Sequence, residues 1–455
     1  GTGSPMWRWR LMNDLPRRFC ICNFGCKVNQ EEGSAVAALF SQAGWQEADV
    51  SAADLIIINT CTVTQIADKK ARNLIRRLHR CYPRAMIVVC GCYAQRAADE
   101  VAALPGVAIV AGVEERRRLP QLVADYLASG GQQRAVAPIA AVRQFQRIAA
   151  GSGQHRARAY LKIEDGCDQF CHYCIIPYVR GPVRSLQPEL ALQQAELLLQ
   201  QGHREIVLSG IHIGAYGQDL EQPDALVELI RRLCALPGLL RLRLGSIEPQ
   251  QFDDALIALI GSEEKLCRHL HIPLQSGCDR TLAAMGRHYD TAFYAALLQR
   301  LRQTGGDIAF TTDVMTGYPG ETPTDHAASL EFCRSCGFAG MHVFPYSRRA
   351  GTKAAALPHQ VPQALKAKRA AALAACAADA AAAYADRWIG QALDFLAEEQ
   401  VEWEGTPCWR GHSGNYLTLL LPVEADPTPP CCSVRVLRRS GEVLLTERVV
   451  ATAHS

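Results

Sequence analysis

The sequence lacks any run of about 18 apolar residues, so it predicts no transmembrane helix. Residues 1–16 contain no long apolar stretch and do not resemble a secretion signal. Excess charge is also lacking, because 48 Lys and Arg residues stand against 45 Asp and Glu residues. A net charge of +3 excludes a globally basic nucleic-acid-binding protein, so any RNA site must be a local patch.

Cysteine, by contrast, is abundant. The chain has 19 cysteines, an odd number, in 455 residues, a length that suits about three domains. Without a secretion signal we expect a cytoplasmic location, where thiols stay reduced. Clustered cysteines in that compartment indicate metal binding rather than disulfides.

Residues 17–130 alternate strand and helix patterns. Short apolar runs rich in β-branched residues predict buried parallel strands, with helical patterns such as Ile66–Arg80 between them. The strands are expected at Phe19–Phe24, Asp54–Thr60, Ala85–Gly91 and Val107–Ala111. This alternation predicts an α/β domain with a doubly wound parallel sheet.

Residues 131–156 are polar and contain glycine pairs, which predicts a linker. From 157 to 387 the alternation resumes, and about six β/α units predict a partial (β/α)6 barrel that ends with the Ala-rich helix Gln363–Arg387. Its strands are expected at Ala157–Ile163, Glu205–Leu208, Leu240–Leu244, His269–Leu274, Ile308–Val314 and Gly340–Phe344. Residues 388–455 carry short alternating segments between Pro and Gly clusters, which predicts a small all-β barrel.

A C-x3-C-x2-C pattern follows the first strand of the predicted (β/α)6 barrel, formed by Cys167, Cys171 and Cys174. Three thiolates in one loop can hold three irons of a [4Fe–4S] cluster and leave the fourth iron open. A structural zinc site requires four protein ligands, and no fourth Cys or His stands at a matching spacing. His172 lies inside the tight loop and is poorly placed as a ligand. The pattern therefore favours an iron–sulfur cluster.

Three further cysteines follow the first three predicted strands of the chain: Cys26, Cys61 and Cys92. The carboxyl ends of neighbouring parallel strands face one crevice, so these side chains should converge. Each cysteine alone would be interpreted as a small buried hydrophobe, but three at equivalent strand ends favour a second [4Fe–4S] cluster with an open iron. Other cysteines of this region are expected to serve packing alone: Cys20, Cys22, Cys81 and Cys90.

The first cysteine loop, with its flanking Lys162-Ile-Glu-Asp-Gly-Cys and Ile175-Ile-Pro-Tyr, resembles the radical S-adenosylmethionine (SAM) superfamily. Nearly the whole chain resembles the methylthiotransferases, a branch of that superfamily. Within that branch the chain looks most similar to the enzymes that act on N6-threonylcarbamoyladenosine in tRNA. The segments that carry this likeness are Gly-Cys26-Lys-Val-Asn-Gln, Asn-Thr-Cys61-Thr-Val-Thr, Gly-Cys92-Tyr-Ala-Gln and His342-Val-Phe-Pro-Tyr-Ser-Arg348. Glu31 stands where an aromatic residue is common, and Gly33 replaces a usual Ser.

The resemblance implies an N-terminal methylthiotransferase domain (17–130), a radical SAM barrel (157–387) and a TRAM-like RNA-binding β-barrel (388–455). It implies a transferase that inserts a methylthio group at C2 of N6-threonylcarbamoyladenosine 37, next to the anticodon. The cluster at Cys167, Cys171 and Cys174 would cleave SAM to a radical, and the cluster at Cys26, Cys61 and Cys92 would carry the sulfur. The implied partners are the tRNA anticodon stem-loop, a sulfur donor, and an electron donor such as flavodoxin or ferredoxin, with no membrane.

Other functions remain open at this point. Within the enzyme class, the substrate could instead be N6-isopentenyladenosine in tRNA or a ribosomal protein side chain. A non-catalytic electron carrier with two clusters would not need a six-unit barrel. An RNA-binding module with structural metal would bind RNA without any of the six cysteines.

Polar and small residues at the carboxyl ends of the barrel strands are candidates for contact with SAM or the base, because barrels keep their active sites there. Each of them could equally support the site without touching a ligand. The candidates are Ser209, Gly210, Ser246, Glu248, Gln275 and Asp313. His271 lies inside an apolar strand and is expected to be a hydrogen-bonded core histidine.

Basic residues near the two cysteine groups are candidates for RNA contact, although simple solvation of a charged face is the usual alternative. The candidates are Lys69, Arg72, Arg76 and Arg80 after Cys61, and Arg180 and Arg184 after the first cysteine loop. In the C-terminal barrel, aromatic residues including Tyr416 accompany arginines, a combination that can hold RNA by stacking and phosphate contact.

Overall fold

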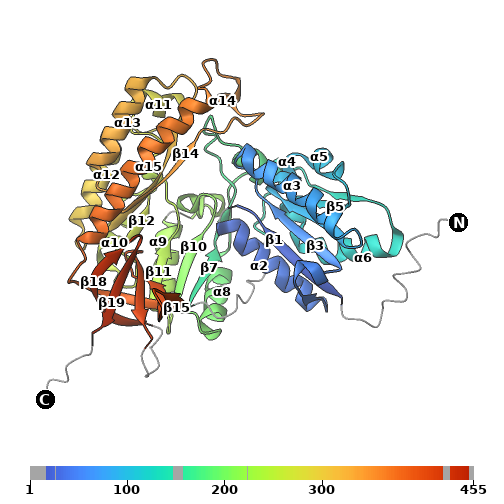
Figure 1. Ribbon diagram of the computed structural model, residues 1–455, viewed down its shortest axis with the longest axis horizontal. Coiled ribbons are helices and arrows are strands. Elements are labelled where there is room, and N and C mark those ends of the chain that lie inside the picture. Colours follow the sequence, from blue (N-terminus) through green and yellow to red (C-terminus); the bar gives the residue numbers. More distant parts are fainter. Residues whose placement is uncertain (1–16, 26, 147–156, 223, 424–430, 450–455) are drawn as a thin grey trace.

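The computed structural model describes residues 17–25, 27–146, 157–222, 224–423 and 431–449. The chain forms an N-terminal α/β domain, a central barrel of strands and helices, and a small β-barrel at the C-terminal end (Figure 1). Among the described residues, no helix is both long enough and apolar enough to span a membrane.

The N-terminal domain is built on a six-stranded sheet in the order β2-β1-β3-β4-β5-β6, in which every pairing is parallel. The predicted doubly wound parallel sheet is confirmed. The strands are β1 (Arg18–Asn23), β2 (Gln46–Glu47), β3 (Leu55–Thr60), β4 (Met86–Gly91), β5 (Val107–Ala111) and β6 (Gln133–Ala135). Neither β2 nor β6 was predicted, because both are short edge strands with polar residues. β6 falls in the segment that was expected to be a linker.

Helices cover both faces of this sheet, because successive residues of a strand point to opposite sides. Ile57 and Val88 pack under the helices of one face, and Ile56 and Val89 under those of the other. The first face carries α2 (Lys27–Gln42) and α6 (Leu119–Ser129). The second face carries α3 (Gln65–Cys81), α4 (Cys92–Arg96) and α5 (Ala98–Ala102). The Thr64 side chain caps α3 by accepting a hydrogen bond from the Ala67 backbone N–H.

The central domain is an open (β/α)6 barrel, as predicted. Two parallel sheets, β11-β10-β7 and β12-β13-β14, are joined by bridges from Leu242 to Leu266 and from Ser246 to His271. Among the described residues β14 does not pair with β7, so the barrel is open between these edge strands. The strands are β7 (Arg158–Lys162), β10 (Glu205–Ser209), β11 (Arg241–Leu244), β12 (His269–His271), β13 (Ala309–Thr316) and β14 (Gly340–Pro345). A short antiparallel pair, β8 (Glu164–Asp165) and β9 (Arg184–Ser185), brackets the first cysteine loop.

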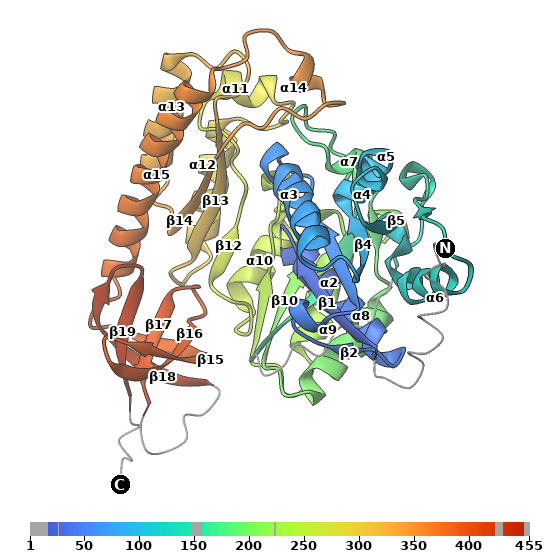
Figure 2. The same cartoon turned by 45° about the vertical axis from the view of Figure 1, so that its right-hand side comes forward.

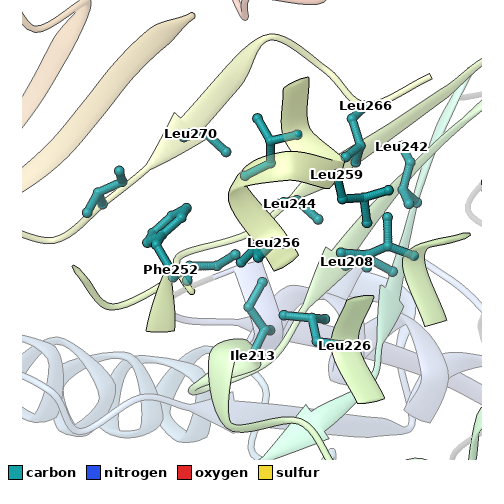
Figure 3. Packing of buried hydrophobic residues seen from close by; sticks show 14 of the residues in the cluster. Leu208, Ile213, Leu226, Leu242, Leu244, Phe252, Leu256, Leu259, Leu266 and Leu270 are labelled. Atoms are coloured by element: carbon teal, nitrogen blue, oxygen red, sulfur yellow. The ribbon is translucent and has the colours of Figure 1, made fainter. Parts of the chain in front are cut away.

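Helices pack against the outer side of these strands. Figure 3 shows Leu208 of β10 and Leu244 of β11 in contact with the same apolar cluster as Leu256 and Leu259. Because the leucines of β11 face the helices, its arginines face the interior of the barrel. The longer helices are α8 (Pro188–Gln200), α9 (Ala225–Cys234), α10 (Asp254–Ser262), α12 (Thr291–Gln303), α13 (Pro323–Ser335) and α15 (Gln363–Asp386). The shorter ones are α7 (Ile176–Arg180), α11 (Asp279–Ala284) and α14 (Lys353–Ala356).

The C-terminal domain is a closed five-stranded barrel in the order β15-β16-β17-β19-β18, which confirms the predicted small all-β barrel. Its core contains Phe395, Leu419 and Val434. Figure 1 shows α15 running along the central barrel and leading into this domain. The strands are β15 (Ala392–Trp403), β16 (Thr406–His412), β17 (Thr418–Pro422), β18 (Cys431–Ser440) and β19 (Val443–Arg448).

The small barrel covers the amino-terminal ends of the central strands. Its Tyr416 ring lies 4.7 Å from the His269 ring and 4.6 Å from the Arg243 guanidinium. Glu205, the first residue of β10, forms ion pairs of 2.8 Å with both Arg241 and Arg243. Tyr416 was expected among the RNA-stacking aromatics, but it lies in this domain interface because its ring packs on charged and aromatic partners of the central barrel.

The interface charges give a first prediction. Glu205→Ala should lower the free energy of unfolding by about 3–5 kcal/mol, because it leaves the buried Arg243 without its carboxylate partner. Urea unfolding measures this loss. Glu399→Ala is the control, since the Glu399–Arg410 pair is solvent-exposed and should contribute less than about 1 kcal/mol. Equal effects of the two substitutions would contradict the proposed importance of the buried pair.

Candidate functional site

The first cysteine group lies in the loop between β8 and α7, at the carboxyl ends of the barrel strands. The pKa of Cys167 is raised to about 12, mainly by burial and in smaller part by the neighbouring Cys174 and Cys171. The loop turns tightly, since Phe170 has φ +45°. At Gly166, φ is +94° and a Cβ would lie 1.9 Å from the Pro182 carbonyl oxygen, so only glycine fits there.

A buried arginine contacts this group. Arg287 donates from Nη1 to the Cys171 Sγ at 3.2 Å and from Nε to the Tyr289 hydroxyl at 3.1 Å. It also forms an ion pair with Glu248, one of the candidates at the strand ends. A charge-assisted donor of this kind stabilises a thiolate ligand. The sequence analysis missed Arg287, because it lies in a loop after α11 and belongs to no spacing motif.

Two buried side chains at the strand ends have polar atoms without a partner among the described residues. Gln275, 8% exposed and with φ +66°, has an unpartnered Oε1, and His212, 4% exposed, has two unpartnered ring nitrogens. Buried polar atoms are almost always hydrogen-bonded, so these atoms indicate a polar ligand at this end of the barrel. Sequence reasoning missed His212, whose only signal was its position just after β10.

The second cysteine group lies at the carboxyl edge of the N-terminal sheet. Thr60 and Gly91, the last residues of β3 and β4, are register partners, so Cys61 and Cys92 leave the sheet side by side. Gly25 adjoins them, since a Cβ at that position would lie 2.4 Å from the Cys61 Cβ. Cys26 itself lies outside the described residues. The expected convergence of strand ends is therefore seen for Cys61 and Cys92.

The rival cysteines lie elsewhere on this sheet. Cys90 is buried among the apolar residues beneath α2 and α6, and Cys22 packs on the opposite face. Burial raises the pKa of Cys20 to about 11, and Cys22 beside it adds to the effect. Cys81 is exposed at the end of α3. Cys22 and Cys90 stand one residue before the ends of β1 and β4, but their side chains lie on the two faces of the sheet.

Arg180 connects the two cysteine groups. It ends α7, directly after the first cysteine loop, and its Nε donates to the Cys92 Sγ at 3.2 Å. Its guanidinium also pairs with Glu32 at 2.5 Å and with Asp165 at 3.2 Å. Burial raises the pKa of the Cys92 thiol, whereas Arg180 and Arg116 oppose that effect. Each of the two groups therefore has one cysteine sulfur that accepts from a buried arginine.

The expected RNA contacts of Arg180 and Arg184 are wrong. Both side chains are 1% exposed, so no nucleic acid reaches them. Arg184 pairs with Glu114 at 3.1 Å and donates to the Arg180 carbonyl oxygen. Their basic character serves the interface between the two domains, where buried carboxylates require cationic partners.

Polar contacts hold the N-terminal domain across the open side of the barrel. At one edge, Glu31 of α2 accepts hydrogen bonds from the Ser209 hydroxyl and the Lys162 backbone N–H. At the other edge, Arg349 after β14 donates to Asp68 at 2.6 Å, and Ser347 accepts from the Gln65 backbone N–H. In Figure 2, α4 lies beside α7, which brings the second cysteine group towards the first.

The remaining candidates differ in their contacts and in their exposure. Gly210 requires its small size, because a Cβ there would lie 2.8 Å from the Glu164 Oε2. Ser246 is bridged to β12, and Asp313 pairs with His271 and His342. On α3, Lys69, Arg76 and Arg80 are exposed. Arg72 is partly buried and donates to the Tyr93 hydroxyl and to Glu100, so it supports the fold.

Comparison with known proteins gives the family. Residues 18–112 match the group described as Uncharacterized protein family UPF0004, and residues 161–333 match the radical SAM superfamily. The chain is 37% identical over 416 residues to the threonylcarbamoyladenosine tRNA methylthiotransferase MtaB of Bacillus subtilis, spanning 91% of this chain and 92% of that protein. The chain belongs to the radical SAM methylthiotransferase family. It is therefore an enzyme, a radical SAM transferase.

The chain is also similar to an enzyme that is named for a different nucleoside. The tRNA-2-methylthio-N(6)-dimethylallyladenosine synthase of Sphingopyxis alaskensis is 34% identical, spanning 87% of this chain and 90% of that protein. Among solved structures, the radical SAM methyltransferase TsrM of Kitasatospora setae has a TM-score of 0.56 at 15% identity, covering 75% of this chain and 77% of that chain. That likeness shows the shared fold.

The described residues of this methylthiotransferase fit the cofactors of its family, which are SAM and two [4Fe–4S] clusters. Cys167, Cys171 and Cys174 supply three sulfur donors in one loop, with Cys171 buried and the other two partly buried, which suits a cluster with one open iron. The unpartnered atoms of Gln275 and His212 suit a polar ligand such as SAM beside that loop. Of the second group, the described Cys61 and Cys92 are buried side by side, as a shared cluster requires.

The contact of Glu31 gives a pH prediction. Burial raises its pKa to about 7, from 4.5, so its contribution to folding is full below about pH 4.5 and is lost as the pH rises through 7. Glu31→Gln should therefore gain stability relative to the wild type, by about 2.5 kcal/mol, between pH 5 and pH 8. Urea unfolding of both proteins at the two pH values measures the difference. A difference that is the same at both pH values would contradict this assignment.

Proposed function

We propose that this enzyme inserts a methylthio group at C2 of N6-threonylcarbamoyladenosine in the anticodon loop of tRNA, at position 37. The observation that carries the proposal is the contact of Arg180 with Cys92, which ties the loop after Cys174 to the second cysteine group. This contact supports two clusters facing one chamber. The 37% identity to a threonylcarbamoyladenosine tRNA methylthiotransferase over 91% of the chain supports the substrate.

In this proposal Cys167, Cys171 and Cys174 hold one [4Fe–4S] cluster, and Cys26, Cys61 and Cys92 hold the other. When bound, the first supplies the electron that cleaves SAM, and the second holds the sulfur that is transferred. His212 and Gln275 would orient SAM through their buried polar atoms, and Ser209 and Gly210 would form the nearby strand end. The protein thereby holds cofactors and base in reactive geometry and excludes water from them.

Exposed side chains near the two cysteine groups form surfaces suited to RNA. Phe170 in the first cysteine loop and Tyr178 in α7 are both about half exposed, and their ring centroids are 5.6 Å apart. Such rings can stack on bases. The exposed side of α3, which begins four residues after Cys61, offers Lys69, Arg76 and Arg80 for phosphate contact. We therefore place the anticodon stem-loop against α3 and the first cysteine loop.

Partners other than tRNA follow from the chemistry. SAM cleavage requires a low-potential electron donor, such as flavodoxin or ferredoxin, and repeated turnover requires a sulfur donor. Both partners, and the cytoplasmic location that they share with tRNA, belong to this proposal.

Two cysteine substitutions test the separate roles proposed for the two clusters. Cys167→Ala should abolish SAM cleavage, because it removes a ligand of the SAM-binding cluster. Cys61→Ala should retain cleavage and lose the methylthio product, and each variant should hold about four irons rather than eight. Chromatographic assay of 5′-deoxyadenosine, iron analysis and mass spectrometry of the RNA give the readouts. Cys81→Ala, at an exposed position, is the control, and full product from the Cys61 variant would refute the second cluster.

The basic face of α3 gives a separate prediction. Replacing Lys69, Arg76 and Arg80 together by Glu should weaken tRNA binding at least about tenfold at low salt and flatten its salt dependence, because phosphate contacts are lost. Fluorescence anisotropy across a salt series measures this. Arg117→Glu, at an exposed position before α6, is the control, and equal loss in both proteins would indicate a non-specific charge effect.

The substrate itself is tested by mass spectrometry of tRNA nucleosides from cells that lack the protein and from cells in which it is restored. The expected result is loss and recovery of the 2-methylthio derivative of N6-threonylcarbamoyladenosine. Loss of a methylthio derivative of N6-isopentenyladenosine would keep the reaction and refute this substrate.

A further inference from the structure

Three polar side chains meet on adjacent strands of the barrel, and one of them is the strand-end candidate Asp313. They are His271 of β12, Asp313 of β13 and His342 of β14, and their ligand-type atoms all lie within 4.8 Å of one another. Asp313 and His342 are register partners, and His271 is the register partner of Thr311. Because rigid parallel strands fix all three positions, the group is part of the framework rather than of a loop.

This histidine–aspartate cluster faces the interior of the barrel. Phe310 and Val314 of β13 pack into the apolar layer under the helices, so Asp313 between them points the other way. Two residues further along the strands, on the same inner face, Met315 and Phe344 pack with Tyr173 of the first cysteine loop. The cluster therefore lies one layer of side chains, about 6.6 Å along the strand, below that loop.

The cluster combines an anion with imidazole groups. Burial raises the pKa of Asp313, but hydrogen bonds from His271 and His342 lower it by more. The pKa is therefore below its usual range, and the carboxylate is ionised. The distances from Asp313 are 3.5 Å to the His271 Nε2 and 3.2 Å to the His342 Nδ1. Thr311 fixes the His271 ring through a 3.0 Å hydrogen bond to Nδ1, and the His342 side chain is 79% exposed.

We propose that the histidine–aspartate cluster binds the polar N6 substituent of the adenine and selects a threonylcarbamoyl group over a hydrocarbon group. This inference rests on the proposed function and names the residues of its substrate specificity. A threonylcarbamoyl group carries N–H and O–H donors, which suit the Asp313 carboxylate, and a carboxylate, which suits an imidazole N–H. A dimethylallyl group has no donor and no carboxylate. It would remove water from Asp313 without forming a hydrogen bond in its place.

The experiment uses the reconstituted full-length enzyme and three anticodon stem-loop RNAs that differ at position 37. These carry N6-threonylcarbamoyladenosine, N6-dimethylallyladenosine or unmodified adenosine. The variants are Asp313→Asn and His342→Gln, and Asp254→Asn on the outer face of α10 is the control, because its side chain is 95% exposed. Anaerobic fluorescence anisotropy gives the affinity for each RNA, and mass spectrometry gives the product.

The wild type should bind the threonylcarbamoyl RNA more tightly than the other two RNAs. Each cluster variant should weaken that binding by about tenfold, as expected for a lost hydrogen bond to a charged group. Affinity for the unmodified RNA should stay within about twofold, so the selectivity disappears, while the control keeps it. Because His342 is exposed, the His342→Gln variant should fold normally, and it tests the inference even if the Asp313 variant misfolds.

Three outcomes would overturn the inference. The first is an equal loss of affinity for all three RNAs, and the second is unchanged selectivity in both variants. The third is loss of binding on treatment with a chelator that leaves the iron content intact, which would assign the three side chains to a metal ion instead. These results differ from failure of the proposed function, which would appear as no methylthio product from the wild type with the threonylcarbamoyl RNA.

Discussion

The buried charges between the N-terminal domain and the barrel are the interaction on which the site depends. Four cations, Lys162, Arg116, Arg180 and Arg184, face three carboxylates, Glu32, Asp165 and Glu114. Burying such groups is costly unless each is paired, so these pairs favour the docking arrangement that is observed. The cations outnumber these carboxylates by one, and Arg180 also donates a hydrogen bond to the Cys92 sulfur. The same contacts that orient the domains thus place the second cysteine group beside the first.

The barrel is closed differently at its two ends, and this divides stability from chemistry. At the amino-terminal end, Tyr416 and the Glu205–Arg243 pair seal the small barrel against the strands. At the carboxyl end, the contacts of Glu31 and Arg349 hold the N-terminal domain at the two edges of the opening. At the carboxyl end, the buried side chains of His212 and Gln275 keep polar atoms without a partner among the described residues. The first cysteine loop lies at this same end of the barrel.

Much of the fold was predictable from the sequence, because its signals are local. Continuous apolar runs such as Leu55–Thr60 give buried parallel strands, and alternating β and α patterns give the doubly wound sheet and the barrel. The short polar edge strand Gln133–Ala135 was missed, since a strand that is held by one neighbour needs no apolar run. The spacing of Cys167, Cys171 and Cys174 is equally local, whereas Cys61 and Cys92 were predicted from their places at the ends of successive strands.

The sequence by itself determined the apolar strands, the main helices, the first cysteine group and the family, because these depend on composition and on spacing along the chain. The tertiary structure decided which basic residues meet solvent and which meet carboxylates: Arg180 and Arg184 are buried, whereas Arg76 and Arg80 are exposed. It also brought Arg287 to Cys171, and His342 to Asp313 and His271. Such contacts join residues that are far apart in the chain, and the burial that pairs them follows from packing, which local patterns do not encode.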